Sequence, residues 1–127
     1  MKNLFISKLS IVVPVYNEEE TIASILNSLK KVRLISDIEK EIIIVNDCSK
    51  DGSETEILKY MSINPDLDIQ YFKHEVNKGK GAALHTGIKK ATGDFLIIQD
   101  ADLEYDPEEY NLLLAPIVKG MADVVYG

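Results

Sequence analysis

Short apolar runs bounded by turn residues recur along the chain and predict five β-strands. The first, second and fourth runs are almost continuously apolar rather than alternating. That pattern is typical of strands covered on both faces, as in parallel sheets. The predicted strands span residues 9–15, 41–45, 69–72, 95–98 and 123–126.

Helical patterns lie between these strands. Apolar residues at 22, 25, 26 and 29 share one face of a first helix. Ser53-Glu54-Thr55-Glu56 has the form of a capping box that opens a second helix. A third helix is predicted from 81 to 91, with Gly93 as its left-handed cap. Asp106-Pro107 provides an N-cap and a first-turn proline for a fourth.

The alternation of strand and helix predicts an α/β fold with a doubly wound, mostly parallel sheet and helices on both faces. At 127 residues the chain is expected to form a single domain, 1–127. In such folds ligands bind outside the carboxyl ends of the strands, where the strand order reverses. The loops that follow the first, second and fourth strands are therefore the candidate site.

The overall charge narrows the classes of partner. A net charge of −7 and a pI near 4.8 argue against a nucleic-acid surface, which needs clustered Lys and Arg. The single Cys48 permits no intrachain disulfide and fits a reducing compartment. No apolar stretch reaches the length that spans a bilayer, and the N-terminus is a poor signal peptide. We expect a cytoplasmic protein, either free or peripheral at the inner face of the membrane.

Two carboxylates mark the end of the fourth predicted strand. Asp100 and Asp102 are spaced so that both side chains point the same way and can share a divalent cation, with substrate phosphates completing its shell. Glu104 continues the alternation and could add a third oxygen ligand. The same spacing at Asp66 and Asp68 falls in a loop without context and is a chance match. A solvated acidic loop would not explain why the acids begin where a buried strand ends.

The loops after the first two strands offer polar side chains. Residues 14–20 contain no glycine, which excludes a dinucleotide-binding turn and a P-loop. Their aromatic ring, amide and carboxylates could bind a ligand, or Asn17 and the Glu run could simply cap the following helix. Asp47 stands directly at the second strand's end, where doubly wound folds place an acid that reads a ribose or base. Cys48 is most simply a small buried residue, and residues 51–53 form a turn and cap.

The Gly-rich segment 77–83 precedes the third helix. Its small residues permit close backbone approach, and Lys80 could meet a base or phosphate. The alternative is an ordinary turn into a tightly packed helix. His74 and His85 are isolated in the sequence and are predicted to be surface or half-buried residues rather than ligands.

These segments together resemble the family 2 glycosyltransferases of GT-A fold. The matching stretches follow in the expected order and cover essentially the whole chain. The two later ones look most like the polyprenol-phosphate, or dolichol-phosphate mannosyltransferase-like, branch. The stretches are residues 10–19, 44–53, 77–81 and 99–107.

The resemblance implies a role for individual residues. Asp47 would accept a hydrogen bond from the base, and Lys80 would lie near the base or diphosphate. Asp102 would be the principal metal ligand and the catalytic residue, with Mg²⁺ or Mn²⁺ as cofactor. Asn46 and Cys48 depart from the commoner Asp and Gly, which would tune the base pocket. The nucleotide-sugar site would also contain Pro14, Val15, Tyr16, Asn17, Glu18, Asp100, Ala101 and Asp102, and the metal site Asp100, Asp102 and Glu104.

The activity that the resemblance implies is inverting transfer of a sugar from a UDP- or GDP-linked donor. The acceptor would be a polyprenyl phosphate or a glycan, as in cell-envelope glycan biosynthesis. Family members continue well past residue 127, so we expect a truncated chain that lacks the acceptor half and self-associates through an exposed surface. The main alternative is a non-catalytic nucleotide-sugar-binding module. A nucleotidyltransferase fits the first loop less well, and a receiver domain leaves 16–18 and 77–81 unexplained.

Overall fold

The computed structural model describes residues 8–34 and 38–101 of the 127-residue chain. Four strands and three helices alternate strictly along this part of the sequence. None of these helices is long and apolar enough to cross a membrane. The elements are β1 (Lys8–Val15), α1 (Ile22–Lys31), β2 (Glu39–Asn46), α2 (Ser53–Ile63), β3 (Ile69–Lys73), α3 (Lys80–Lys90) and β4 (Phe95–Ile98).

The four strands form one parallel sheet in the order β3-β2-β1-β4. Each crossover places the next strand outward until the chain returns over the sheet to lay β4 beside β1. The order therefore reverses between β1 and β4, which is the position where doubly wound sheets bind ligands. The register pairs Val15 with Asn46 and Asn46 with Lys73, so three strands end level with one another.

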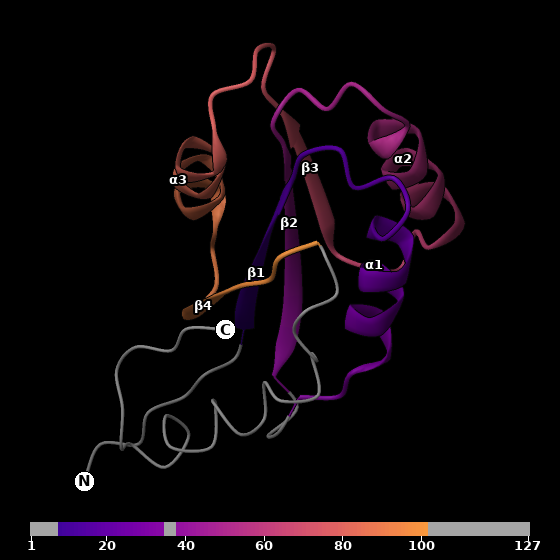
Figure 1. Ribbon diagram of the computed structural model, residues 1–127. Helices are drawn as coiled ribbons and strands as arrows, with labels where there is room; N and C mark the ends of the chain where they lie inside the picture. The colour runs from indigo at the N-terminus through magenta and orange to yellow at the C-terminus, as the bar shows by residue number, and fades with distance from the viewer. Residues whose placement is uncertain (1–7, 35–37, 102–127) are drawn as a thin grey trace, which may run out of the picture.

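Helices cover both faces of the sheet. In Figure 1, α1 and α2 lie on one side of the strands and α3 lies on the other. Successive side chains of β2 point to opposite faces, so Ile42 and Ile44 join the core under α1 and α2 while Ile43 and Val45 join the core under α3. The predicted doubly wound α/β fold is confirmed. The predicted strand 123–126 and the helix from Asp106 lie outside the described residues.

Two predictions about helix ends are wrong. Ser53 is the first residue of α2 rather than its N-cap, because Asp51 Oδ1 accepts both its N–H, at 2.9 Å, and its hydroxyl, at 2.6 Å. Gly93 is not a left-handed cap, since α3 ends at Lys90 and its C-cap residue, Ala91, is extended. Gly93 is needed for close packing instead. A Cβ there would lie 2.8 Å from the backbone nitrogen of Ser10 and 2.9 Å from the carbonyl oxygen of Lys8.

A buried carboxylate ties the strands together at the end of the sheet opposite to the reversal site. Glu41 is fully buried near the start of β2 and accepts hydrogen bonds from Ser10 Oγ at 2.7 Å and from Thr92 Oγ1 at 2.6 Å. Lys8 Nζ lies 3.1 Å from it. Burial would raise the pKa of Glu41, but these hydrogen bonds outweigh it and lower the pKa to about 2. The ionised carboxylate therefore joins β1, β2 and the segment before β4.

Candidate functional site

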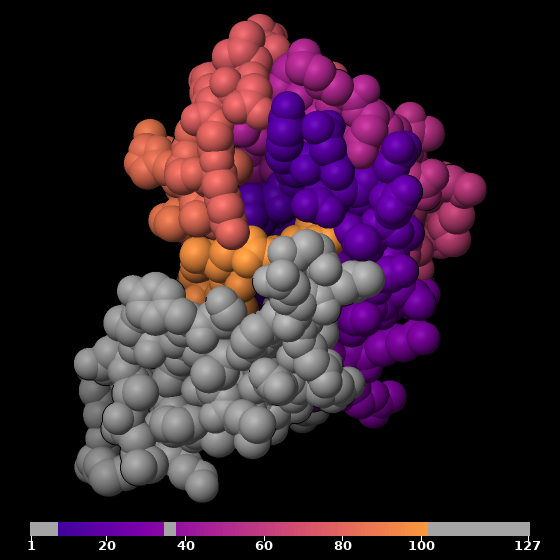
Figure 2. Space-filling view, in the orientation of Figure 1, coloured from indigo at the N-terminus to yellow at the C-terminus, as the bar shows by residue number. Residues whose placement is uncertain are grey.

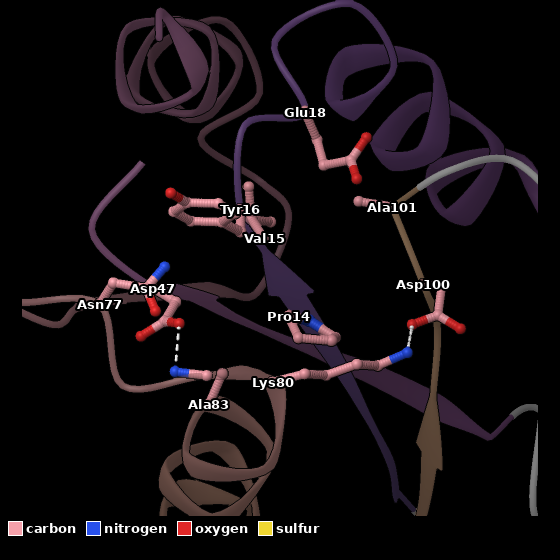
Figure 3. A pocket seen from close by; sticks show the side chains of 11 residues that line it. Pro14, Val15, Tyr16, Glu18, Asp47, Asn77, Lys80, Ala83, Asp100 and Ala101 are labelled. Atoms are coloured by element: carbon pink, nitrogen blue, oxygen red, sulfur yellow. Dashed lines mark hydrogen bonds and ion pairs between the residues drawn. The ribbon is translucent and has the colours of Figure 1, made fainter. Parts of the chain in front are cut away.

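A cleft of 380 Å³ opens at the carboxyl ends of the strands, at the β1/β4 reversal. Figure 2 shows the surface hollowed between α3 and the loop after β1, with the end of β4 beside it. The cleft falls in the usual size range of small-ligand sites. Its lining residues come from four segments and are Pro14, Val15, Tyr16, Glu18, Asp47, Asn77, Gly79, Lys80, Ala83, Asp100 and Ala101 (Figure 3).

The parallel ladder brings these segments together. Backbone hydrogen bonds continue past the strand ends, from Asp47 N–H to Val15 carbonyl at 2.8 Å and from Gln99 N–H to Val12 carbonyl at 2.9 Å. The loops that follow β1, β2 and β4 consequently leave the sheet side by side. The structure gathers at this cleft eight of the predicted nucleotide-sugar residues, namely Pro14, Val15, Tyr16, Glu18, Asp47, Lys80, Asp100 and Ala101.

Apolar side chains form part of the cleft wall. Tyr16 is 42% exposed although it is a large aromatic residue; its ring stands beside Val15, and Pro14 lines the cleft nearer Lys80 (Figure 3). Ala83, from the first turn of α3, contributes a small side chain to the part of the wall that α3 forms. A flat aromatic ring and small apolar neighbours can accommodate the face of a nucleobase, because every base presents a π-face for stacking.

Asn17 fastens the first loop to the second. It adopts a left-handed backbone conformation with φ of 54°, which Asn tolerates better than most residues. Its Oδ1 accepts a hydrogen bond from the N–H of Lys50 at 2.8 Å, and its N–H donates to Ser49 Oγ at 3.0 Å. Asn17 does not line the cleft, so the structure gives it a role in holding the loops rather than a direct contact with that space.

The glutamates after Asn17 serve two different helices. The carbonyl of Glu18 accepts the N–H groups that open α1, and its side chain faces the cleft. Glu19 Oε2 instead accepts the N–H of Gly52, the N-cap of α2, at 2.9 Å. The N-cap residue of α1 is Thr21, which makes no side-chain capping bond. The alternative in which Asn17 and the Glu run cap α1 is therefore wrong for Asn17 and Glu19.

Asp47 is buried and bonded on three sides. Its Oδ1 accepts hydrogen bonds from His74 Nδ1 and from the N–H of Lys78, both at 2.8 Å. Its Oδ2 accepts the N–H of Gly79 at 2.7 Å (Figure 3). Burial would raise the pKa of Asp47, but these hydrogen bonds outweigh it and hold the pKa below its usual value. Asp47 is thus an ionised acceptor at the cleft wall.

The role of His74 was missed by sequence reasoning, which predicted a surface or half-buried residue. The structure buries its side chain to 9% exposure between Asp47 and Thr86, whose Oγ1 lies 2.8 Å from Nε2. The positions of the strand ends in the sequence could have indicated this contact. His74 follows β3 as directly as Asp47 follows β2, and neighbouring parallel strands bring such positions together.

Lys80 and Asp100 approach each other across the cleft. Lys80 opens α3, Asp100 follows β4, and their Nζ and Oδ1 atoms lie 2.6 Å apart (Figure 3). The side chains are 61% and 43% exposed, so both remain accessible to a ligand. Lys80 is the positive group among the lining residues, and Gly79 before it has a φ of 95° that only glycine adopts easily.

The predicted metal ligands are only partly within the described chain. The carboxylate of Asp100 lines the cleft and offers the oxygen atoms that Mg²⁺ and Mn²⁺ favour. Asp102 and Glu104 lie outside the described residues, so their prediction is untested. Within 8–34 and 38–101, no group of three or more His, Cys, Asp or Glu side chains could hold a metal.

Asn46 and Cys48, the two residues that depart from the commoner family pattern at the end of β2, do not line the cleft. The side-chain amide of Asn46 donates to Tyr71 Oη at 2.9 Å, and its oxygen accepts the N–H of Ser49 at 3.0 Å. Cys48 is half-buried rather than buried, and its φ of 59° is left-handed. The idea that these residues tune the base pocket receives no support from their contacts.

The sequence of the chain is similar to those of known sugar transferases. A model of the family described as glycosyl transferase family 2 matches residues 10–127. The chain is 37% identical over 120 residues to an undecaprenyl-phosphate 4-deoxy-4-formamido-L-arabinose transferase of Yersinia pestis (strain Pestoides F). That match covers 94% of this chain and 36% of the relative, so the chain spans about a third of the relative's length.

Solved structures give the same picture. A mannosyltransferase from Pyrobaculum calidifontis, in complex with GDP-Man and Mn²⁺, superposes with a TM-score of 0.73 at 28% identity. The match covers 91% of this chain and 32% of that one. Residues 1–349 of TarS from S. aureus, in complex with UDP-GlcNAc, superpose with a TM-score of 0.74 at 32% identity, covering 89% and 31%. The relatives include one bound to a guanosine and one to a uridine diphosphate sugar.

Proposed function

Since this chain belongs to glycosyl transferase family 2, we propose that it binds a nucleoside diphosphate sugar and takes part in sugar transfer to a polyprenyl phosphate. The observation that carries the proposal is the cleft at the β1/β4 reversal, where an aromatic ring, an ionised acceptor and a lysine face one space. The Yersinia relative is by name an undecaprenyl-phosphate sugar transferase, which supports a lipid-phosphate acceptor.

The donor would lie along the cleft from Asp47 to Asp100. The base would stack beside Tyr16 and meet the carboxylate of Asp47. The diphosphate would displace Asp100 from the ammonium group of Lys80, since both are anionic partners for the same cation. Glu18 and Ala101 line the far wall, near the position that the sugar would occupy.

The hydrogen bonds of Asp47 favour uracil as the base. Two of its four lone pairs, both on Oδ1, already accept from His74 and Lys78, and Oδ2 accepts from Gly79. One lone pair remains, which matches the single N–H of uracil. Guanine presents adjacent N–H groups that need two free acceptors, and cytosine turns a lone pair toward the carboxylate. An unpaired group at such an edge costs about 1–3 kcal/mol.

The proposed chemistry is inverting displacement. An acceptor oxygen forms a bond to the anomeric carbon while the bond from that carbon to the diphosphate oxygen breaks, and the nucleoside diphosphate leaves with the electron pair. A lipid-phosphate oxygen is already anionic and needs no general base. Lys80 would offset part of the charge that builds on the leaving group.

A divalent cation fits the donor set at the end of β4. Asp102, with Asp100 and Glu104, would hold Mg²⁺ or Mn²⁺, and the ion would supply Lewis-acid stabilisation of the diphosphate. The Mn²⁺ in the Pyrobaculum structure supports this assignment. We expect Asp102→Ala to abolish the part of nucleotide binding that depends on metal. Unchanged affinity of that variant in Mn²⁺ would contradict the metal assignment.

The first test is thermal stability of the chain with UDP, GDP, CDP and ADP, each with and without Mn²⁺. A ligand at about 100 times its dissociation constant stabilises the native state by roughly 2.7 kcal/mol, which shifts the melting temperature measurably. A metal-dependent shift that is largest with UDP supports the proposal. Absence of a shift with all four would overturn it.

The second test separates an enzyme from a binding module. The chain is incubated with UDP-sugars and undecaprenyl phosphate, and release of UDP is followed. Metal-dependent release that requires the lipid supports transfer. Tight UDP binding without release, under conditions in which a longer family member turns over, would favour the non-catalytic module.

A further inference from the structure

Neither the fold nor the proposed reaction requires a histidine at position 74. Its backbone N–H extends the sheet ladder by donating to the carbonyl of Asn46 at 2.9 Å. Its ring is then held between the second loop and α3, with Nδ1 on Asp47 and Nε2 on Thr86, both at 2.8 Å. The ring does not itself line the cleft.

The direction of the hydrogen bond to Asp47 follows from charge. An ionised carboxylate only accepts, so Nδ1 of His74 must carry the proton that it donates. The low pKa of Asp47 is consistent with this arrangement. Thr86 can serve Nε2 in either protonation state, because a hydroxyl both donates and accepts. Thr86 therefore fixes the plane of the ring, and the ring fixes the carboxylate.

Asp47 consequently holds both the turn before α3 and the helix itself. It binds directly the N–H groups of Lys78 and Gly79, in the turn before the helix, and it binds Thr86, midway along the helix, through His74. Rotation of the Asp47 side chain would have to break contacts on both oxygens. The remaining lone pair of Oδ2 is thereby kept in one direction, beside the cleft.

We infer that His74 is a positioning residue that aims Asp47 at the nucleobase, and that Thr86 in turn aims His74. The inference rests on the proposed function, because it requires that the cleft bind a nucleotide through Asp47. It assigns base selectivity to a buried residue outside the cleft. It also couples base recognition to α3, whose first residue, Lys80, faces the diphosphate position.

The test compares UDP and CDP binding by isothermal titration calorimetry in Mn²⁺ for a set of single variants. His74→Leu replaces the ring with an apolar side chain of similar size and removes the donor, and we expect a loss of about tenfold or more in UDP affinity. The ratio of UDP to CDP affinity should fall as well, because an unaimed carboxylate no longer distinguishes the two base edges.

His74→Asn is the rescue variant. Its side-chain amide can place an N–H near the position of Nδ1, and we expect UDP affinity and the UDP to CDP ratio to return to within about threefold of the wild type. Thr86→Val removes the hydroxyl without changing volume, and we expect an intermediate loss, which also carries the test if His74→Leu does not fold. His85→Leu, at an exposed neighbouring histidine, is the matched control and should change nothing.

The outcomes distinguish the positioning role of His74 from the proposed binding of a nucleotide. If the wild-type chain binds UDP and a folded His74→Leu binds UDP and CDP with unchanged affinities, the positioning role is wrong and the proposed function stands. If Thr86→Val and His74→Asn lose as much as His74→Leu while circular dichroism shows altered folds, the role is structural. If the wild-type chain binds no nucleotide, both are overturned.

Discussion

Lys80 Nζ lies 2.6 Å from Asp100 Oδ1, which links the first residue of α3 to the loop after β4 across the mouth of the cleft. Both groups are substantially exposed, and exposed ion pairs of this kind contribute about 0–1 kcal/mol to stability. The contact therefore contributes little to the fold. Its importance is that it keeps a cation and an anion beside the space proposed for a diphosphate.

Lys80→Met should weaken UDP binding about tenfold while leaving uridine binding and the melting temperature nearly unchanged, because only the diphosphate uses the lysine charge. Affinities by calorimetry and melting by circular dichroism measure the three quantities. Lys78→Met is the matched control, since its side chain is exposed and does not line the cleft. Equal losses for UDP and uridine, or an equal effect of Lys78→Met, would refute the assignment of Lys80.

The fold and the general place of the site were predictable from the sequence because both depend on local patterns. The apolar runs located each described strand to within two residues, and the end of a parallel strand is a fixed place in space. Asp47 and Asp100 could therefore be assigned to one edge. That edge became a cleft only where α3 crosses back over the sheet, which no local pattern specifies.

Two of the missed features depend on contacts between distant segments. His74 acquires its role from Thr86 on α3, and Glu19 turns away from α1 because the N–H of Gly52 is within reach. In both cases tertiary packing selected the partner. The capping box at Ser53 failed for a local reason, since Asp51, two residues before it, competes for the same N–H group.

Stability should fall in acid through Glu41. Its folded pKa of about 2 lies below the usual 4.5, so its ionised form stabilises the fold fully above pH 4.5, and this contribution is lost as the pH falls from 4.5 toward 2. The shift corresponds to roughly 3 kcal/mol. Denaturant unfolding from pH 7 to pH 2 measures it in the wild type and in Glu41→Gln.

The variant isolates that contribution. Glu41→Gln should be less stable at pH 7 by about 2–3 kcal/mol, and the two free energies of unfolding should converge as the pH approaches 2. UDP affinity of the folded variant should be unchanged, because Glu41 lies near the start of β2 and does not line the cleft. A pH-independent difference would show that ionisation of Glu41 is not responsible.

Two glycines of α3 should respond oppositely to alanine. A Cβ at Gly87 would lie 2.4 Å from Val12 Cγ1, so Gly87→Ala must push the helix from the sheet and should cost about 1–3 kcal/mol. A Cβ at Gly81 meets nothing within 4 Å, so Gly81→Ala should gain up to about 0.5 kcal/mol from helix propensity. Urea midpoints of the two variants compare them directly. Similar effects at both positions would contradict the close approach of Gly87 to β1.

The backbone at Cys48 offers a test of stored strain. A non-glycine residue in the left-handed region costs roughly 1–2 kcal/mol, and glycine there recovers that cost less about 0.5–1 kcal/mol of its own chain entropy. Cys48→Gly should therefore be neutral or more stable by up to about 1.5 kcal/mol. Cys48→Ala is the matched variant, because it loses the same contact of Sγ with the carbonyl of Glu75 but keeps the strain. If alanine equals or exceeds glycine in the free energy of unfolding, the left-handed conformation carries no cost at this loop.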